Sequence, residues 1–328
     1  AFGNCYRLVE IFNKSKLTIE TGSNKNGSIG LNALNVYTPN KGQSNIYETE
    51  DGYIFCSYGE KYYLVAYHGE ETELNLPNDC EGNVYEIFKY AFTDCSDITS
   101  VVIPKDVTAI GSKAFAGCSS IKSITVPFLG QSKDSLTNNF FSYIFGADTV
   151  KDNIKVIPTT LETVVILSET EIAASSFYGT RIKSITLPDD LTKIGESAFF
   201  ACSGITSIDF PESLIEIGES AFKNCTGLGK FEIPGNLEII GKEAFSGCRN
   251  IKEITLPSSI KVIGASAFEN CKGISEITIP EGVVELPTSA FKGCSGLVTV
   301  SLSETTEQIG DSAFYGCTKI ESIDISHV

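Results

Sequence analysis

The sequence contains no methionine, no tryptophan and only two histidines, His68 and His327, among its 328 residues. Histidine is the usual base and metal ligand near neutral pH. The sequence therefore has too few histidines for catalytic triads or metal centres built on several of them. Because methionine is absent, we expect that Ala1 is not a translation start. Any leader or anchor is then expected outside this sequence.

Positive charge and long apolar segments are also scarce. The 25 Lys and Arg residues stand against 41 Asp and Glu residues, which gives a net charge of −16. An acidic chain is poorly suited to phosphate contacts, so we expect no nucleic acid partner. Apolar runs such as residues 164–167 fall far short of the roughly 20 residues of a membrane-spanning helix. Neither end resembles a signal peptide, and we expect no membrane span in this sequence.

One motif dominates what the sequence does contain. Ala-Phe-x-x-Cys begins at Ala91, Ala114, Ala198, Ala221, Ala244, Ala267, Ala290 and Ala313. Neighbouring copies are 23 residues apart except across one gap, where residues 176–180 form a degenerate copy. Residues 1–5 form a further copy whose first part is missing. A fixed period of this length indicates a repeat architecture.

Each repeat predicts two short strands followed by a turn. In the copy at 205–225, residues 207–210 alternate with period two and stop at a proline, as a short strand does. Residues 214–218 form a second extended piece, and its final glycine predicts a turn with positive φ. Residues 219–225 place Ala, Phe and Cys on one face, which predicts one helical or 3₁₀ turn.

A 23-residue unit cannot bury this many apolar side chains alone. Units stacked about 4.8 Å apart along a parallel ladder bury them in one continuous column. The sequence therefore predicts a β-rich α/β repeat solenoid.

The repeat resembles the unit of the BspA-like leucine-rich repeat family. The resemblance is carried by Leu228-x-x-Phe231-x-Ile233-Pro234-x-x-Leu237-x-x-Ile240-Gly241-x-x-Ala244-Phe245-x-x-Cys248, and it covers residues 76–127 and 159–328. It implies a right-handed leucine-rich-repeat superhelix from a bacterial cell-surface or secreted protein, a family associated with adhesion. It implies no enzyme activity and an extracellular or cell-surface location.

We expect one continuous solenoid with two non-repeat inserts. Residues 1–5 end a truncated repeat, 6–75 form an insert with a tyrosine-rich β-hairpin, 76–127 are repeats, 128–158 form a second insert, and 159–328 are repeats. The second insert is expected to leave the solenoid and pack back on its flank. Because both ends interrupt the repeat, we expect the chain to be a fragment of a longer array.

Nine of the eleven cysteines occupy one slot of the repeat. Zinc sites need converging pairs, and stacked cysteines point their Cβ atoms in parallel, which disfavours disulfides. We expect the slot cysteines to be buried free thiols, with no metal and no cofactor. Cys56 and Cys80 lie outside the slot, and the sequence does not decide whether they form a disulfide with each other.

No pattern among the acidic residues predicts catalysis. Residues 48–52 lack the alternating ligand spacing of a calcium loop. The many carboxylates supply accidental pairs of the kind that glycoside hydrolysis needs. None of these carboxylates differs in position from the acidic residues that recur at solvent-facing positions of the repeat. A carbohydrate-active enzyme is kept as a remote alternative.

The aromatic residues of the inserts are the candidate binding surface. They are Tyr53, Tyr58, Tyr62, Tyr63, Tyr67, Phe140, Phe141 and Tyr143. Exposed aromatic clusters mark interaction sites, and the alternative is that these rings anchor the inserts. The solvent-facing strand positions, here called the strand face, hold short polar residues such as Thr186 and Thr255, so we expect weak binding there.

Two functions share this fold. The first is an adhesion or protein-binding ectodomain, whose partner is an extracellular or host protein, matrix protein or glycan. The second is a passive spacer that presents another domain. We expect a monomer in either case.

Overall fold

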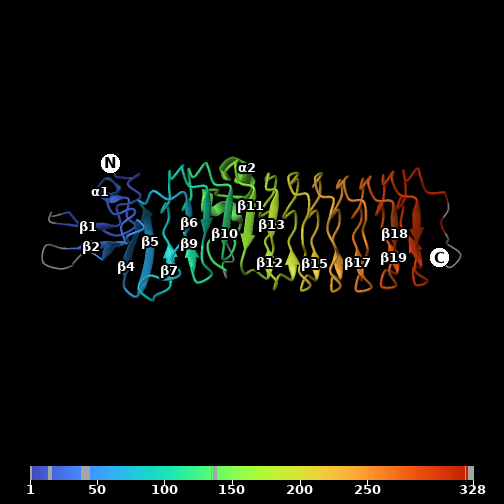
Figure 1. The fold of residues 1–328 in the computed structure, drawn as a ribbon, viewed down its shortest axis with the longest axis horizontal. Coiled ribbons are helices and arrows are strands. Elements are labelled where there is room, and N and C mark those ends of the chain that lie inside the picture. Colours follow the sequence, from blue (N-terminus) through green and yellow to red (C-terminus); the bar gives the residue numbers. More distant parts are fainter. Residues whose placement is uncertain are drawn as a thin grey trace.

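Each repeat forms one coil of a solenoid, and the coils stack along a single axis (Figure 1). The computed structural model describes residues 2–13, 17–37, 45–133, 135, 139–321 and 323. Figure 1 shows the chain progressing along this axis from the N-terminal end to the C-terminal end. The repeat solenoid predicted from the sequence is confirmed.

Two parallel ladders run along the solenoid. The first strand of each repeat supplies β6 (Glu73–Asn75), β8 (Ser100–Val102), β10 (Ser123–Val126), β11 (Thr163–Ile166) and β13 (Ser184–Thr186), and later β18 (Glu276–Thr278) and β20 (Thr299–Ser301). The second strand supplies β12 (Glu171–Ile172), β14 (Lys193–Ile194), β15 (Glu216–Ile217), β16 (Ile239–Ile240) and β17 (Val262–Ile263), then β19 (Glu285–Leu286) paired with β21 (Gln308–Ile309). Ile194, Ile217, Ile240 and Ile263 are successive register partners, so the stacking period is 23 residues.

The N-terminal region adds strands to the second ladder. β4 (Tyr53–Tyr58) and β5 (Lys61–Tyr67) form an antiparallel hairpin, with β3 (Ile46–Glu48) on its outer side. β5 then pairs in parallel with β7 (Tyr85–Ile87), which pairs with β9 (Ala109–Ile110). β1 (Glu10–Phe12) and β2 (Asn35–Tyr37) form a separate parallel pair, with the short helix α1 (Lys25–Ser28) between them in sequence.

The predicted helical turn at Ala-Phe-x-x-Cys is wrong. Ser220 and Asn224 have φ values of 55° and 62°, and left-handed residues interrupt a right-handed helix. The segment is instead a series of tight turns, in which the Lys223 N–H donates to the Ser220 carbonyl at 3.1 Å. The Phe222 N–H donates at 2.7 Å to the Ala244 carbonyl of the next repeat, so these turns also join the coils.

The predicted positive φ at the glycine before this turn is also wrong. Gly241 is absent from the positive-φ residues of the described chain. A Cβ atom on Gly241 would lie 2.6 Å from the Glu219 nitrogen of the preceding repeat. The glycine is needed because two backbones approach closely there.

The phenylalanines of the repeat stack into a column at the centre of the core. Phe199, Phe222 and Phe245 are fully buried, and their ring centroids are 5.1 and 5.4 Å apart at interplanar angles of 7° and 5°. Offset stacking of this kind adds to the free energy gained by burial. The column makes the repeats a single continuous core.

The second insert contributes to this column and does not simply pack on the flank. It contains η1 (Phe141–Phe145), η2 (Val150–Asp152) and α2 (Asn153–Val156). The ring of Phe141 lies 5.0 Å from that of Phe177, and the ring of Phe145 lies 6.4 Å from that of Phe115. The insert thereby fills the core between two repeats that would otherwise leave a gap in the column.

The slot cysteines form a hydrogen-bonded ladder of free thiols. All eleven cysteines are free, including Cys56 and Cys80. The Cys225 thiol donates to the Phe199 carbonyl of the preceding repeat at 2.9 Å, and the same bond recurs from one repeat to the next. Its donors are Cys118, Cys202, Cys225, Cys248, Cys271, Cys294 and Cys317.

Two slot cysteines depart from the predicted burial. Cys5 is exposed and Cys95 is half-buried, because each belongs to a copy without a complete repeat stacked before it. Burial raises the pKa of the fully covered thiols, with values of about 12 for Cys202 and Cys248.

The first ladder is interrupted in the middle of the solenoid. Although every residue from 207 to 256 is described, the only bridge of the first ladder there joins Ser207 to Lys230. Phe210 and Phe231 replace the aliphatic residues of other repeats at inward-facing strand positions, and their rings lie 5.7 Å apart. Two extra rings between the strands oppose the close approach that ladder hydrogen bonds require. The strand predicted at 207–210 is therefore reduced to a single bridge.

Candidate interaction surfaces

Four of the eight predicted aromatic contact residues are buried. Tyr53 and Tyr67 are each 5% exposed, Phe140 is 8% exposed and Phe141 is 1% exposed. The Tyr53 hydroxyl donates to the Asn75 carbonyl at 3.3 Å, and burial raises its pKa to about 12. These four side chains anchor the inserts and offer a partner little surface.

The other four aromatic residues differ in exposure. Tyr58 is 50% exposed near the tip of the β4–β5 hairpin, whereas Tyr62, Tyr63 and Tyr143 are half-buried. The ring of Tyr63 meets that of Phe88 edge-on, with centroids 5.7 Å apart. The candidate contact surface of the hairpin is thus centred on Tyr58.

The aromatic groups of the two inserts are connected through phenylalanines of the repeats. The ring of Tyr67 lies 6.1 Å from that of Phe92, which stacks on Phe115 at 4.8 Å. Phe115 in turn lies beside Phe145 of the second insert. The inserts are therefore linked through the phenylalanine column, and this linkage gives them a packing role.

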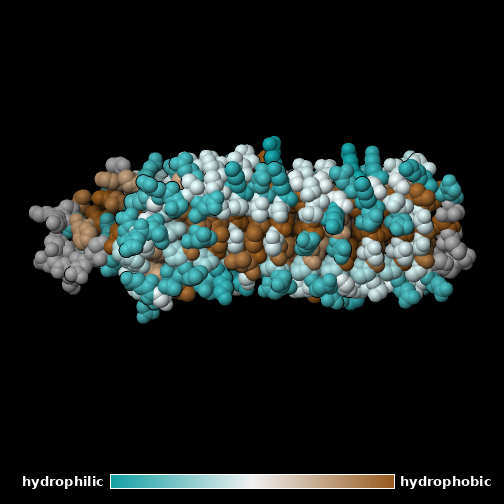
Figure 2. All heavy atoms as spheres, viewed as in Figure 1, coloured by the Kyte–Doolittle hydropathy of each residue, from teal (hydrophilic) through white to brown (hydrophobic). Residues whose placement is uncertain are grey.

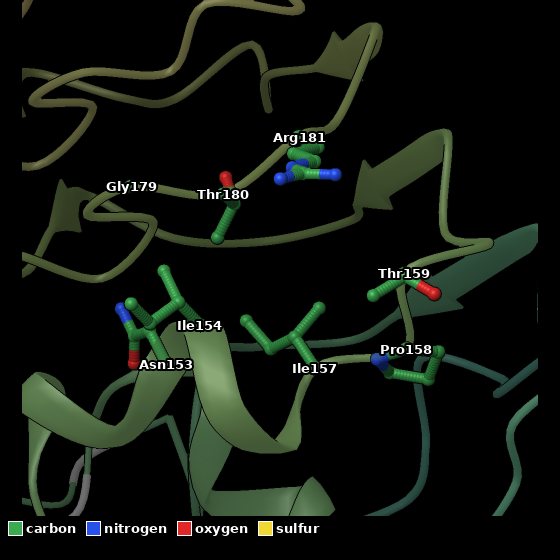
Figure 3. Close-up of a pocket in the computed structure, with 8 residues that line it drawn as sticks. All are labelled: Asn153, Ile154, Ile157, Pro158, Thr159, Gly179, Thr180 and Arg181. Atoms are coloured by element: carbon green, nitrogen blue, oxygen red, sulfur yellow. The ribbon is translucent and has the colours of Figure 1, made fainter.

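A pocket of about 300 Å³ lies between α2 and residues 179–181. Figure 3 shows Ile154 and Ile157 pointing from the insert toward Thr180, while Pro158 and Thr159 close one side. Thr180 turns its methyl group into the pocket (Figure 3), since its hydroxyl contacts the Cys202 sulfur at 3.3 Å. The walls are consequently aliphatic.

A buried asparagine holds α2 against the repeats. The Asn153 side chain is 1% exposed, and its amide nitrogen donates to the carbonyls of Ser175 and Ser176 at 3.0 and 3.2 Å. Its amide oxygen accepts a hydrogen bond from the Ser142 hydroxyl. A buried polar group with several partners fixes the position of its segment, so the wall formed by α2 is rigid.

The pocket combines exposed apolar surface with one cation. Ile154 is 64% exposed, and Arg181 is the only ionisable residue among those that line the pocket. Figure 3 shows the side chain of Arg181 on the side of the pocket opposite Ile157. This arrangement suits a ligand that carries both an aliphatic group and a negative charge.

The sequence pattern did not single out Ile154 or Arg181 as contact residues, although the repeat pattern contains a signal for Arg181. Arg181 occupies the position that is glycine in the repeats beginning at Ile205, Leu228 and Ile274. A Cβ atom on Gly204 would lie 2.7 Å from the Arg181 carbonyl oxygen. Arg181 stands beside the insert, where no regular repeat precedes it, and a side chain is accommodated there.

The interruption of the first ladder opens a second hollow on the strand face. This groove has a volume of about 590 Å³ and is lined by Lys230, Glu232, Lys252 and Glu253 around Phe231. Figure 2 shows a band of hydrophobic residues along the long axis with polar residues on both sides. The charges that line the groove are balanced, so it selects neither anions nor cations.

Three further observations bear on chemistry. Among the described residues, no three His, Cys, Asp or Glu side chains gather in a way that could hold a metal ion. No helix in the described part of the chain is long and apolar enough to cross a membrane. Burial raises the pKa of slot thiols such as Cys118 and Cys294, which opposes formation of the nucleophilic thiolate.

Comparison with known proteins identifies the repeat. Residues 67–164, 170–297 and 217–328 match the BspA type leucine-rich repeat region, in six copies. The comparison with curated proteins finds no match.

Solved structures of leucine-rich repeat proteins are similar in part. A leucine-rich cell surface protein from Faecalibacterium prausnitzii is 22% identical, with 87% of this chain and 97% of that chain covered and a TM-score of 0.38. A leucine-rich repeat protein from Bacteroides ovatus is 24% identical, with 87% and 82% covered and a TM-score of 0.46.

Proposed function

Because the chain belongs to the family of BspA type leucine-rich repeat proteins, we propose that it is a non-catalytic, protein-binding ectodomain of a bacterial cell-surface or secreted protein. Its partner is an extracellular or host protein, and its role is adhesion or capture. The repeats supply a rigid scaffold, and recognition is concentrated on the inserts that the scaffold carries.

The exposed isoleucine beside the pocket is the observation that supports this proposal most. Ile154 exposes 64% of its surface, on a segment that the buried Asn153 holds in place. Rigid apolar surface next to a pocket loses little conformational entropy on binding and gains free energy from burial. The exposed parts of the predicted contact residues Tyr58, Tyr62, Tyr63 and Tyr143 also belong to the proposed contact surface.

The test is a binding array of secreted proteins, matrix proteins and glycans, probed with the whole chain. We expect a protein ligand whose affinity, measured afterwards by biolayer interferometry, falls at least roughly tenfold in Ile154→Ser, as for a central apolar contact. Ile215→Ser is the matched control, because Ile215 is also exposed, at 43%, on a regular repeat. This variant should bind normally.

The alternative is a passive spacer, which predicts no specific ligand. An array without protein hits would favour the spacer and count against the binding function. Binding that is lost equally in both isoleucine variants would show that the contact does not involve the insert. Hits confined to glycans would replace the protein partner by a carbohydrate.

A further inference from the structure

We propose that the pocket between α2 and residues 179–181 binds the C-terminal residue of a partner protein. The aliphatic side chain of that residue packs on Ile154 and Ile157, and its carboxylate pairs with Arg181. This inference rests on the proposed protein-binding function and specifies which part of the partner is recognised.

The charge of the pocket selects an anion. Arg181 makes no ion pair with any described residue, whereas nearby Lys155 and Lys183 are paired with Asp152 and Glu162. Among the described residues, no acidic side chain lines the pocket. In a chain of net charge −16, an exposed and unpaired guanidinium is a distinctive site for a carboxylate, which it can bind through two parallel hydrogen bonds.

The walls of the pocket select an aliphatic group. Figure 3 shows the side chains of Ile154 and Ile157 and the methyl group of Thr180 converging on the same space. Ile157 is 9% exposed and closes the floor, while Ile154 stays open to solvent. A side chain such as leucine placed here removes apolar surface of both molecules from water.

A chain end meets both demands within one residue. The last residue of a protein carries its carboxylate and its side chain on the same Cα atom, so the two groups enter a small pocket together. In an extended internal segment, neighbouring side chains point to opposite faces. When an acidic residue stands next to an aliphatic residue in such a segment, only one of the two side chains faces a pocket of about 300 Å³.

The pocket is formed before any partner binds. The hydrogen bonds of Asn153 fix α2 on one side, and the Phe177 N–H donates to the Ala198 carbonyl of the next repeat at 2.8 Å on the other. Gly179 has a φ of 69°, and a Cβ atom there would lie 3.0 Å from a methyl carbon of Ile154. The absence of a side chain at Gly179 leaves room beside Ile154.

The test uses fluorescein-labelled decapeptides that end in Leu, Ile or Val, titrated with the whole chain by fluorescence polarisation. Each peptide is made as a free acid, as a C-terminal amide, and with an added Asp-Gly-Gly tail. This tail moves the terminal carboxylate away from the aliphatic residue and places an acidic side chain on the residue next to it. We expect the free acid to bind roughly tenfold more tightly than the amide, as for a charge-assisted hydrogen bond. Arg181→Gln should abolish this difference, and Arg249→Gln, at another exposed arginine of the repeats, should retain it.

The outcomes separate this inference from the proposed function. Equal binding of acid and amide, tighter binding of the tailed peptide, or an unchanged acid preference in Arg181→Gln would overturn the chain-end assignment. If no peptide binds while the array yields a protein whose capture needs Ile154, the assignment fails and the binding function stands. If neither peptide nor protein binds, both fail.

Discussion

At the scale of single residues, the geometry of the backbone determines where the repeat needs a glycine and where it tolerates another residue. Gly264 sits where a Cβ atom would lie 2.2 Å from the Lys242 nitrogen. Ser266, two residues later, has a φ of 56°. The repeat therefore uses glycine for a close approach of two chains, and it places an ordinary residue in the left-handed conformation that glycine would adopt more easily.

The first prediction compares these two positions. Gly264→Ala should lower the free energy of unfolding by several kcal/mol, since a main-chain atom cannot give way as a side chain does. Ser266→Gly should change it by less than about 1 kcal/mol, because relief of left-handed strain offsets the greater freedom of glycine in the unfolded chain. Urea denaturation of both variants is the measurement. A larger loss in Ser266→Gly would show that we have assigned the roles of the two positions wrongly.

The second prediction concerns the thiol ladder at alkaline pH. Burial raises the pKa of Cys202, Cys248 and Cys294 from 9.0 to about 12. Between these values the unfolded chain has released thiol protons that the folded chain keeps. The unfolded state then binds fewer protons, so the free energy of unfolding is maintained below pH 9 and falls as pH rises toward 12. Each thiol contributes a slope of up to about 1.4 kcal/mol per pH unit.

Urea denaturation between pH 8 and pH 10.5 measures this slope. Cys248→Ala removes one buried thiol and should make the slope shallower, even though the variant is less stable at pH 8. Cys5→Ala removes an exposed thiol and is the control. An identical slope in all three proteins would exclude the thiols as its source.

At the scale of secondary structure elements, packing overrides the strand pattern in one region. The second ladder continues from β15 through β17, while the first ladder fails beside it. Phe231 stacks on Phe245 with centroids 5.2 Å apart, and Phe210 meets Phe222 edge-on at 5.6 Å. Both repeats thus hold an additional ring in the core, and the first ladder is lost while the column survives.

The third prediction is that Phe231→Ile restores the ladder between residues 230–233 and 253–256. A smaller inward residue lets the strands approach, so the backbone amides there should exchange with solvent more slowly. Native-state hydrogen exchange followed by mass spectrometry is the measurement. Ile277→Val, in the already paired strand β18 (Glu276–Thr278), is the control. Unchanged or faster exchange in Phe231→Ile would mean that the rings do not cause the break.

At the scale of the whole molecule, the stability of the solenoid is the sum of the interactions between neighbouring coils. Neighbouring coils are joined by the second ladder, the thiol bonds and the phenylalanine column, and outside the interrupted region also by the first ladder. Exposed ion pairs such as Lys261 with Glu238, at 2.7 Å, also join neighbouring repeats but contribute little. The free energy of unfolding that is lost when a core side chain is truncated should therefore depend on how many neighbouring repeats that side chain contacts.

The fourth prediction compares two phenylalanines of the column. Phe245 is fully buried between Phe222 and Phe268, and Phe245→Ala should cost about 3–5 kcal/mol. Phe314 is half-buried and has a ring contact only with Phe291 among the described residues, so Phe314→Ala should cost less. Chemical denaturation of both variants decides, and equal losses would contradict the nearest-neighbour description.

Local, periodic information in the sequence was sufficient to determine the solenoid. Recurrence of residues such as Ile217, Phe222 and Cys225 every 23 residues requires stacking, because no repeat can bury these side chains alone. The same recurrence predicted that the slot cysteines are free, and it marked residues 6–75 and 128–158 as departures from the pattern.

Tertiary structure decided whatever depends on contacts between repeats. It placed Phe141 inside the phenylalanine column and brought the backbone of the preceding repeat close to Gly241. It also brought Ile154 beside Arg181, which lies 27 positions later in the sequence. The period of a repeat specifies what each unit buries, but the inserts have no period. Where their side chains lie depends on the shape and hydrogen-bonding groups that the folded repeats present to them, and this information is carried by the folded chain as a whole.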